Sequence, residues 1–308
     1  MRLLHGSRPL LHEMSNVGMI TALRELSQQD RINFLLTNRV PRKALTHLVG
    51  WWSRIESPLL TRASIAVWRL FTDLDLSDAE RQHFDSLRAC FTRQLIPGAR
   101  TVDPRPDVVT SPCDAVVGAC GDVAGTTVFQ AKGFPYDLED LIPELHLRRD
   151  FKNGRYVTLR LKSNMYHRFH APVDCATEEI YYISGDTWNV NPITLKRVER
   201  LFCRNERAVV PLEPASTTGK ICLVPVAAIL VASMKFAGIE EAFDLRYMGP
   251  RRISWNLSFR KGDEMGYFQQ GSTIILFATG NYALCDNIEP GIAIRMGQAL
   301  LADTAFKE

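Results

Sequence analysis

The first hundred residues carry apolar positions at helical spacing. In the first predicted helix these positions are three or four residues apart: Leu45, Leu48, Val49, Trp52 and Ile55. Ser57-Pro58 predicts a break, because proline favours the first turn of a new helix. A second helix is expected over 59–71, carrying Trp68, and a third, weaker one over 74–91.

Beyond a proline-rich linker the pattern changes to short β-branched runs separated by turn residues. Pro97-Gly98 and the segment 103–106 form this linker. A short helix is expected over 135–145, led in by Asp137. The predicted strands cover 107–110, 126–130, 155–161, 179–183, 208–212, 222–232 and 273–278.

Many strands and few helices predict an α+β protein. We expect N-terminal amphipathic helices, followed by a mostly antiparallel β sandwich or barrel-like catalytic domain. The expected division is a helical, membrane-associating region over 1–100 and a β-rich domain over 101–308.

Basic residues gather in the helical region, which bears on its surroundings. Positions 31–70 contain a single acidic residue, Glu56, and seven basic residues: Arg31, Arg39, Arg42, Lys43, Arg54, Arg62 and Arg69. Such an excess is drawn to an anionic lipid surface by about 1 kcal/mol per basic residue near it. With Trp51, Trp52 and Trp68 it predicts an interfacial amphipathic element. The alternative is an ordinary helical hairpin whose tryptophans lie in its core.

Composition narrows the class of protein. The 308 residues are 46% hydrophobic and 23% charged, which is typical of a globular chain, and the net charge of +3 gives no reason to expect nucleic acid as a partner. The longest uncharged apolar run, 221–234, contains Pro225 and is shorter than the ~20 residues of a spanning helix. No apolar stretch near the N-terminus is long enough for a secretory signal.

The cysteines predict neither disulfides nor a zinc site. The seven are odd in number, scattered and without a C-x-x-C pair, so a reducing, cytoplasmic setting is expected. They are Cys90, Cys113, Cys120, Cys175, Cys203, Cys222 and Cys285.

A small-residue break, Gly271-Ser272-Thr273, interrupts an apolar stretch near the C-terminus. Gly271 permits backbone angles that other residues avoid, so the peptide bond before Ser272 can be held open to attack. The strand predicted directly afterwards would anchor the far side of that bond. Taken by itself, the tripeptide is more typical of a turn at a strand edge.

Two other segments carry the groups that would activate a serine hydroxyl. His167 and His170 lie in one segment, and Asp114 follows Pro112 in another. An imidazole can remove and return a proton near neutral pH, and a buried aspartate can fix its tautomer. The alternatives are structural histidines or a metal pair for His167 and His170, and a turn residue for Asp114.

Four segments, in this order, are similar to those of the phosphatidylserine decarboxylase family of prokaryotic type. They are Pro112-Cys113-Asp114-Ala115, Gln130-Ala131-Lys132-Gly133, Tyr166-His167-Arg168-Phe169-His170 and Gln270-Gly271-Ser272-Thr273. The resemblance extends from about residue 40 to residue 280. The chain departs from the family pattern at Ala115, where glycine is usual, at Met165, often an aspartate, and at Gln270, usually apolar.

The resemblance implies a self-processing enzyme. Asp114, His170 and Ser272 would form a self-cleavage triad that cuts between Gly271 and Ser272, giving chains 1–271 and 272–308. Ser272 would become a covalent pyruvoyl group that forms a Schiff base with the substrate amine, with neither pyridoxal phosphate nor a metal required. His167 is the candidate proton donor in the later decarboxylation.

The same resemblance implies the partners. The substrate would be phosphatidylserine, converted to phosphatidylethanolamine and CO2 on the cytoplasmic face of the cell membrane, with an anionic membrane surface as docking partner. The two cleavage products would stay together as a non-covalent heterodimer and pair into a dimer of these.

Two other functions fit parts of the sequence. A catalytically inactive family member would act as a membrane-binding module. A serine hydrolase acting on lipid esters is disfavoured, because the chain lacks the glycine two residues after Ser272 that a nucleophile elbow requires.

Overall fold

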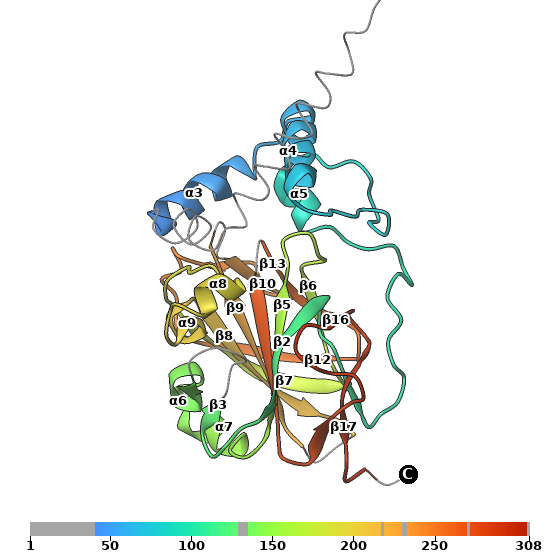
Figure 1. Ribbon diagram of the computed structural model, residues 1–308, viewed down its shortest axis with the longest axis vertical. Coiled ribbons are helices and arrows are strands. Elements are labelled where there is room, and N and C mark those ends of the chain that lie inside the picture. Colours follow the sequence, from blue (N-terminus) through green and yellow to red (C-terminus); the bar gives the residue numbers. More distant parts are fainter. Residues whose placement is uncertain (1–40, 129–134, 217–218, 230–232, 270–271, 307–308) are drawn as a thin grey trace, which may run out of the picture.

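The computed structural model describes residues 41–128, 135–216, 219–229, 233–269 and 272–306 (Figure 1). Two of the four family-like segments lie wholly or partly outside this range, at 130–133 and at Gln270-Gly271. The ends of the predicted strands 126–130 and 222–232, and the bases Arg31 and Arg39, also lie outside it.

Within the described residues, three helices precede the sheets and lie together at one end of the molecule (Figure 1). They are α3 (Arg42–Trp52), α4 (Pro58–Phe71) and α5 (Leu87–Phe91). The break predicted at Ser57 is confirmed: its side chain caps α4 by accepting from the Leu60 amide at 3.5 Å, and Pro58 occupies the first turn.

The third predicted helix, 74–91, was wrong over most of its length. Asp75 accepts a hydrogen bond from the Ser77 amide at 2.8 Å, and Ser86 caps the short α5 through the Ala89 amide at 3.1 Å. Such local side-chain bonds compete with helix formation. The segment instead builds a small core with α4, and its buried members are Leu74, Leu76, Ala79 and Cys90.

The main sheet has eight antiparallel strands in the described part of the chain, in the order β12-β7-β8-β9-β14-β5-β2-β16. Its outer strands, β12 and β16, do not pair with each other, so the sheet is open and the barrel-like alternative was wrong. The bounds, in sheet order, are Arg252–Phe259, Cys175–Ile183, Arg207–Pro214, Ile221–Ala227, Ser272–Ala278, Arg155–Leu161, Ala115–Asp122 and Ala293–Ile294.

One face of this sheet packs against two smaller antiparallel sheets and forms the larger core. Side chains such as Leu276 on β14 share this core with Phe169 and Phe268, whose ring centroids are 5.4 Å apart. One small sheet holds β11 (Phe243–Asp244), β10 (Ser233–Phe236), β13 (Glu264–Phe268) and β6 (Arg168–His170). The other holds β1 (Val108–Thr110), β17 (Ala299–Asp303) and β15 (Tyr282–Leu284).

Short helices and a hairpin cover the opposite face, where Phe277 of β14 packs on Phe151. These elements are β3 (Thr127–Val128), β4 (Tyr136–Asp137), α6 (Leu138–Leu141), α7 (Leu145–Asp150), α8 (Pro192–Leu195) and α9 (Leu201–Arg204). The helix predicted over 135–145 is confirmed only as α6. A second helix begins at Leu145, where the sequence predicted an end.

Strand β14 lies at the centre of the molecule. All seven of its residues are buried between β9 and β5, and its first residue, Ser272, is in register with Ala227 and Leu161. Among the helices described, none is long and apolar enough to cross a membrane.

Candidate active site

Ser272 begins the central strand with a buried hydroxyl group. Its side chain has no solvent exposure, and its Oγ makes no hydrogen bond within the described structure. A buried hydroxyl without a partner costs free energy, so such groups need an explanation. Register pairing with Leu161 and Ala227 holds Ser272 on both sides, so its position is fixed while its hydroxyl makes no hydrogen bond within the described residues.

His167 lies at the same end of the sheet as Ser272. Its Nε2–H donates to the carbonyl of Lys162 at 3.0 Å, and Lys162 directly follows Leu161, the register partner of Ser272. The Nδ1 atom is buried without a partner. Burial lowers the pKa of His167 to about 3, so the ring is neutral at neutral pH with an open lone pair on Nδ1.

His170 is a neutral imidazole with both ring nitrogens engaged. Its Nδ1–H donates to the Gly262 carbonyl at 2.8 Å, and the Tyr166 hydroxyl donates to Nε2 at 3.0 Å. Burial is the main cause that lowers the pKa of His170, while the charge of Asp114 raises it by a smaller amount. The backbone of Gly262 therefore fixes the tautomer.

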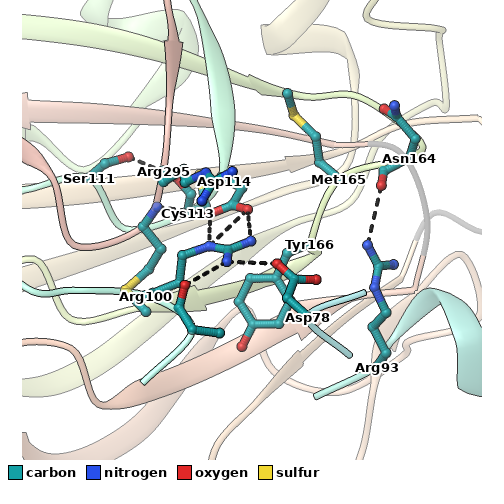
Figure 2. A network of polar contacts seen from close by, with 12 residues as sticks. Asp78, Arg93, Arg100, Ser111, Cys113, Asp114, Asn164, Met165, Tyr166 and Arg295 are labelled. Carbon is teal, nitrogen blue, oxygen red and sulfur yellow. Dashed lines mark hydrogen bonds and ion pairs between the residues drawn. The ribbon is translucent and has the colours of Figure 1, made fainter. Parts of the chain in front are cut away.

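Asp114 binds an arginine that the sequence analysis missed (Figure 2). Nε of Arg100 lies 2.9 Å from Asp114 Oδ1, its Nη2 lies 2.5 Å from Oδ2, and the Met296 amide donates to Oδ1 at 2.9 Å. Both side chains are largely buried. A guanidinium fork matches a carboxylate better than a single imidazole N–H does, so Asp114 makes no hydrogen bond to His170.

Arg100 also joins the helical region to the sheet. Its Nη1 bonds to Asp78 at 2.8 Å, so one guanidinium bridges a carboxylate from each part of the chain (Figure 2). Arg100 and Asp114 are separated by a proline-rich linker, and no spacing rule connects residues across such a segment. The basic character of the chain before the Pro-Cys-Asp segment was the signal in the sequence that Asp114 could pair with an arginine.

Arg168, which lies between the two histidines in sequence, anchors their segment to neighbouring parts of the chain. It bonds to both carboxylate oxygens of Glu264, at 2.6 and 2.8 Å, and to the carbonyl of Thr92 at 2.7 Å. Arg93 likewise reaches across to the carbonyl of Asn164 at 3.2 Å (Figure 2). These bonds hold the loop that carries both histidines against the end of α5.

A cavity of about 980 Å³ opens beside this site, between the helices and the end of the main sheet. Ligand pockets of this size hold drug-sized or larger molecules. Leu161 and Phe91 line it, and the Phe91 ring stacks on His167 with centroids 4.0 Å apart. The remaining apolar lining comes from Trp68, Phe71, Leu87, Val190, Pro192, Ala228 and Ile229.

The structure thus brings together part of the predicted site. His167 bonds to Lys162, which directly follows the register partner of Ser272, and His170 of β6 bonds to the Tyr166 hydroxyl. Asp114 acts on His170 only through its charge in this arrangement. The catalytic roles of these residues, and the cut after Gly271, remain predictions.

Fold and site together define an α+β enzyme with a buried serine and two buried histidines beside an apolar cavity. The family model for phosphatidylserine decarboxylase matches residues 87–302, and the chain belongs to that family.

Curated relatives named phosphatidylserine decarboxylase proenzyme match nearly the whole chain. The Erwinia tasmaniensis protein is 33% identical over 296 residues, covering 91% of this chain and 96% of its own. The Yersinia enterocolitica protein is 32% identical over 283 residues, with 88% and 96% covered. The Dickeya dadantii protein is 32% identical over 282 residues, with 88% and 92% covered.

Proposed function

We propose that this protein converts phosphatidylserine to phosphatidylethanolamine and CO2, after cutting its own chain between Gly271 and Ser272. Family membership and the proenzyme name of its relatives support the reaction. The observation that carries the self-cleavage is the buried Ser272 hydroxyl at the start of the central strand, which makes no hydrogen bond within the described structure.

In the proposed cleavage, His170 Nε2 takes the proton of the Ser272 hydroxyl. For this, Ser272 must replace the Tyr166 hydroxyl that donates to Nε2 in the structure. The Ser272 oxygen attacks the Gly271 carbonyl carbon, the bond from that carbon to the Ser272 nitrogen breaks, and the nitrogen receives the proton. An ester then joins the two pieces.

Loss of the Ser272 Cα proton then breaks the bond between Cβ and oxygen. This frees the Gly271 carboxylate and leaves a dehydroalanine, which hydrolyses to a pyruvoyl group with release of ammonia. Chains 1–271 and 272–308 result. We expect them to stay together, because every residue of β14 is buried between β9 and β5.

The residues around Ser272 fit a pyruvoyl group. The position is buried, its hydroxyl makes no hydrogen bond to any described residue, and the strand that would carry the group is held on both sides. Such a carbonyl supplies the electron sink for loss of a carboxylate from an amino acid.

His167 is the proposed proton carrier in the decarboxylation. Its Nε2–H is held by the Lys162 carbonyl, so Nδ1 is the atom free to exchange a proton. Because the pKa of His167 is about 3, Nδ1 must first take up a proton before it can deliver one.

We further propose that the helices dock the enzyme on the cytoplasmic face of the cell membrane. Trp51 and Trp52 are exposed by 62% and 42%, which supports the interfacial interpretation. Trp68 is half-buried and stacks on Phe91, which supports the alternative of a packed helical hairpin for this residue. The apolar cavity opens beside the same helices, where a diacyl lipid would arrive.

The test compares wild-type protein with Ser272→Ala. Wild type should run as two fragments and release CO2 from phosphatidylserine, and the variant should remain one chain without activity. Ser233→Ala is the matched control, because Ser233 is also a buried, unpartnered serine that begins a strand, β10. Self-cleavage that persists in Ser272→Ala would refute the proposal, and an uncut, inactive wild type would favour the inactive membrane-binding alternative.

A further inference from the structure

Arg160 stands in the wall of the large cavity, one residue before the register partner of Ser272. It lies near the end of β5, paired with Thr273 of β14 and Val116 of β2. Its aliphatic stem crosses Gly118, where an added Cβ would lie 3.2 Å from the Cγ and Cδ atoms of Arg160. The bulge at this point of β2 leaves room for the arginine side chain.

The Arg160 guanidinium has no counter-charge in the described structure. It makes no hydrogen bond and no ion pair there, although the side chain is half-buried. Burial lowers the pKa of Arg160, and no carboxylate raises it. The acidic residue in the cavity lining, Asp73, is exposed and forms no ion pair with Arg160.

A half-buried arginine that lacks a partner among the described residues destabilises the fold, unless a bound ligand supplies the missing counter-charge. An arginine remains charged in proteins, and its fork of donors fits oxygen anions such as phosphate. The neighbouring Lys162 also lines the cavity and adds a second positive charge. The rest of the wall is largely apolar, so the expected ligand combines an anionic head with hydrocarbon.

We propose that Arg160 binds the phosphodiester of the phospholipid headgroup inside this cavity. The inference rests on the proposed function and assigns the headgroup contact within that same site. Side chains alternate between faces along a strand, so Arg160 approaches the cavity from the face opposite to the Ser272 side chain. That separation suits an anion that lies several bonds from the reacting carbon.

The substrate carboxylate is a poorer ligand for Arg160 than the phosphodiester. An arginine bound to the carboxylate would stabilise the ground state that decarboxylation must leave, and so would slow the reaction. The phosphodiester keeps its charge throughout. Arg160 should therefore bind substrate and product alike.

Binding can be measured on the uncut Ser272→Ala protein, which requires no activity. Calorimetric titration with dihexanoyl phosphatidylethanolamine, dihexanoyl phosphatidylserine and dihexanoylglycerol is then repeated with Arg160→Gln added. Loss of a charge-assisted hydrogen bond should weaken both phospholipids roughly 10- to 100-fold and leave dihexanoylglycerol unchanged. Arg160→Lys should recover part of the loss.

Arg155→Gln is the matched control, because Arg155 lies on the same strand but pairs with Asp122 outside the cavity. It should bind all three lipids as the parent does. Weakening of phosphatidylserine alone would assign Arg160 to the carboxylate and overturn the proposal. Equal affinity of parent and Arg160→Gln, or equal weakening of dihexanoylglycerol, would also overturn it.

Inorganic phosphate separates a lipid site from a simple anion site. We expect it to bind at least tenfold more weakly than the phospholipids, because it gains nothing from the apolar wall. Equal affinity would overturn the assignment to a lipid headgroup. All these results are independent of self-cleavage, so the headgroup contact and the proposed reaction can fail separately.

Discussion

At the scale of single residues, the bridge from Asp114 through Arg100 to Asp78 is a largely buried chain of three charged side chains. Arg100 is only 8% exposed and contacts both carboxylates at 2.8 Å or less. A buried pair of this kind adds little net stability, but removing one partner leaves an uncompensated charge. Asp114 therefore depends on Arg100 for its position.

Arg100→Gln should destabilise the protein by about 3 kcal/mol, because the buried Asp114 carboxylate loses its counter-charge. Chemical denaturation in the Ser272→Ala background, where the chain stays whole, measures this directly. The control is Arg105→Gln, since Arg105 pairs with Asp103 at a site where its side chain is 59% exposed. It should leave the free energy of unfolding nearly unchanged, because solvent screens an exposed ion pair. Similar losses in the two variants would contradict the buried-bridge interpretation.

Residue chemistry was predictable from the sequence where one segment carries it. Ser272, His167 and His170 were identified from short motifs, and the structure buries all three. Partners from distant segments were not predictable. Arg100 forms the ion pair with Asp114, and the carbonyl of Gly262 accepts the hydrogen bond from His170 Nδ1–H. Nothing in the sequence shows that Arg160 has no counter-charge, because that depends on what surrounds it in space.

At the scale of elements, α4 presents an apolar surface that no described residue covers. Leu59 is 80% exposed and Val67 is 54% exposed, on the helix that also lines the cavity. Exposed apolar side chains that lie together on one helix indicate an interaction surface. In the proposed function that partner is the lipid bilayer.

Leu59→Asp should weaken binding to vesicles that contain anionic lipid by about tenfold or more, because one buried leucine contributes about 1.5–3 kcal/mol. Sedimentation with vesicles measures the effect. Leu145→Asp is the control, since Leu145 is 50% exposed on α7, at the far end of the molecule from α4 (Figure 1). Equal loss in the two variants, or no loss in Leu59→Asp, would argue against docking through α4.

Elements with a strong local signal were predicted well. Ser57-Pro58 fixed the start of α4, and the apolar run after Ser272 matches β14 almost to the residue. The segment 74–91 was predicted as helix because its apolar residues recur, but Asp75 and Ser86 bind the backbone locally. Periodicity alone could not reveal that competition.

At the scale of the whole molecule, the central position of β14 in the sheet explains how the chain could be cut and its two pieces stay together. Strand β14 lies in the middle of the sheet, with a complete ladder to β5 on one side and β9 on the other. The sequence predicted an antiparallel β domain but left sandwich and barrel open. Strand order decides between them, and it depends on long-range pairing that local patterns do not encode.

The most direct measurement is the intact mass of the purified full-length protein, taken after it elutes as a single native particle. Under denaturing conditions we predict two chains, an unmodified 1–271 and a 272–308 fragment that is lighter than its unmodified sequence by one ammonia. Borohydride treatment should change the mass of the short fragment alone. A single unmodified chain of 308 residues that still releases CO2 from phosphatidylserine would contradict the proposed origin of the reactive carbonyl.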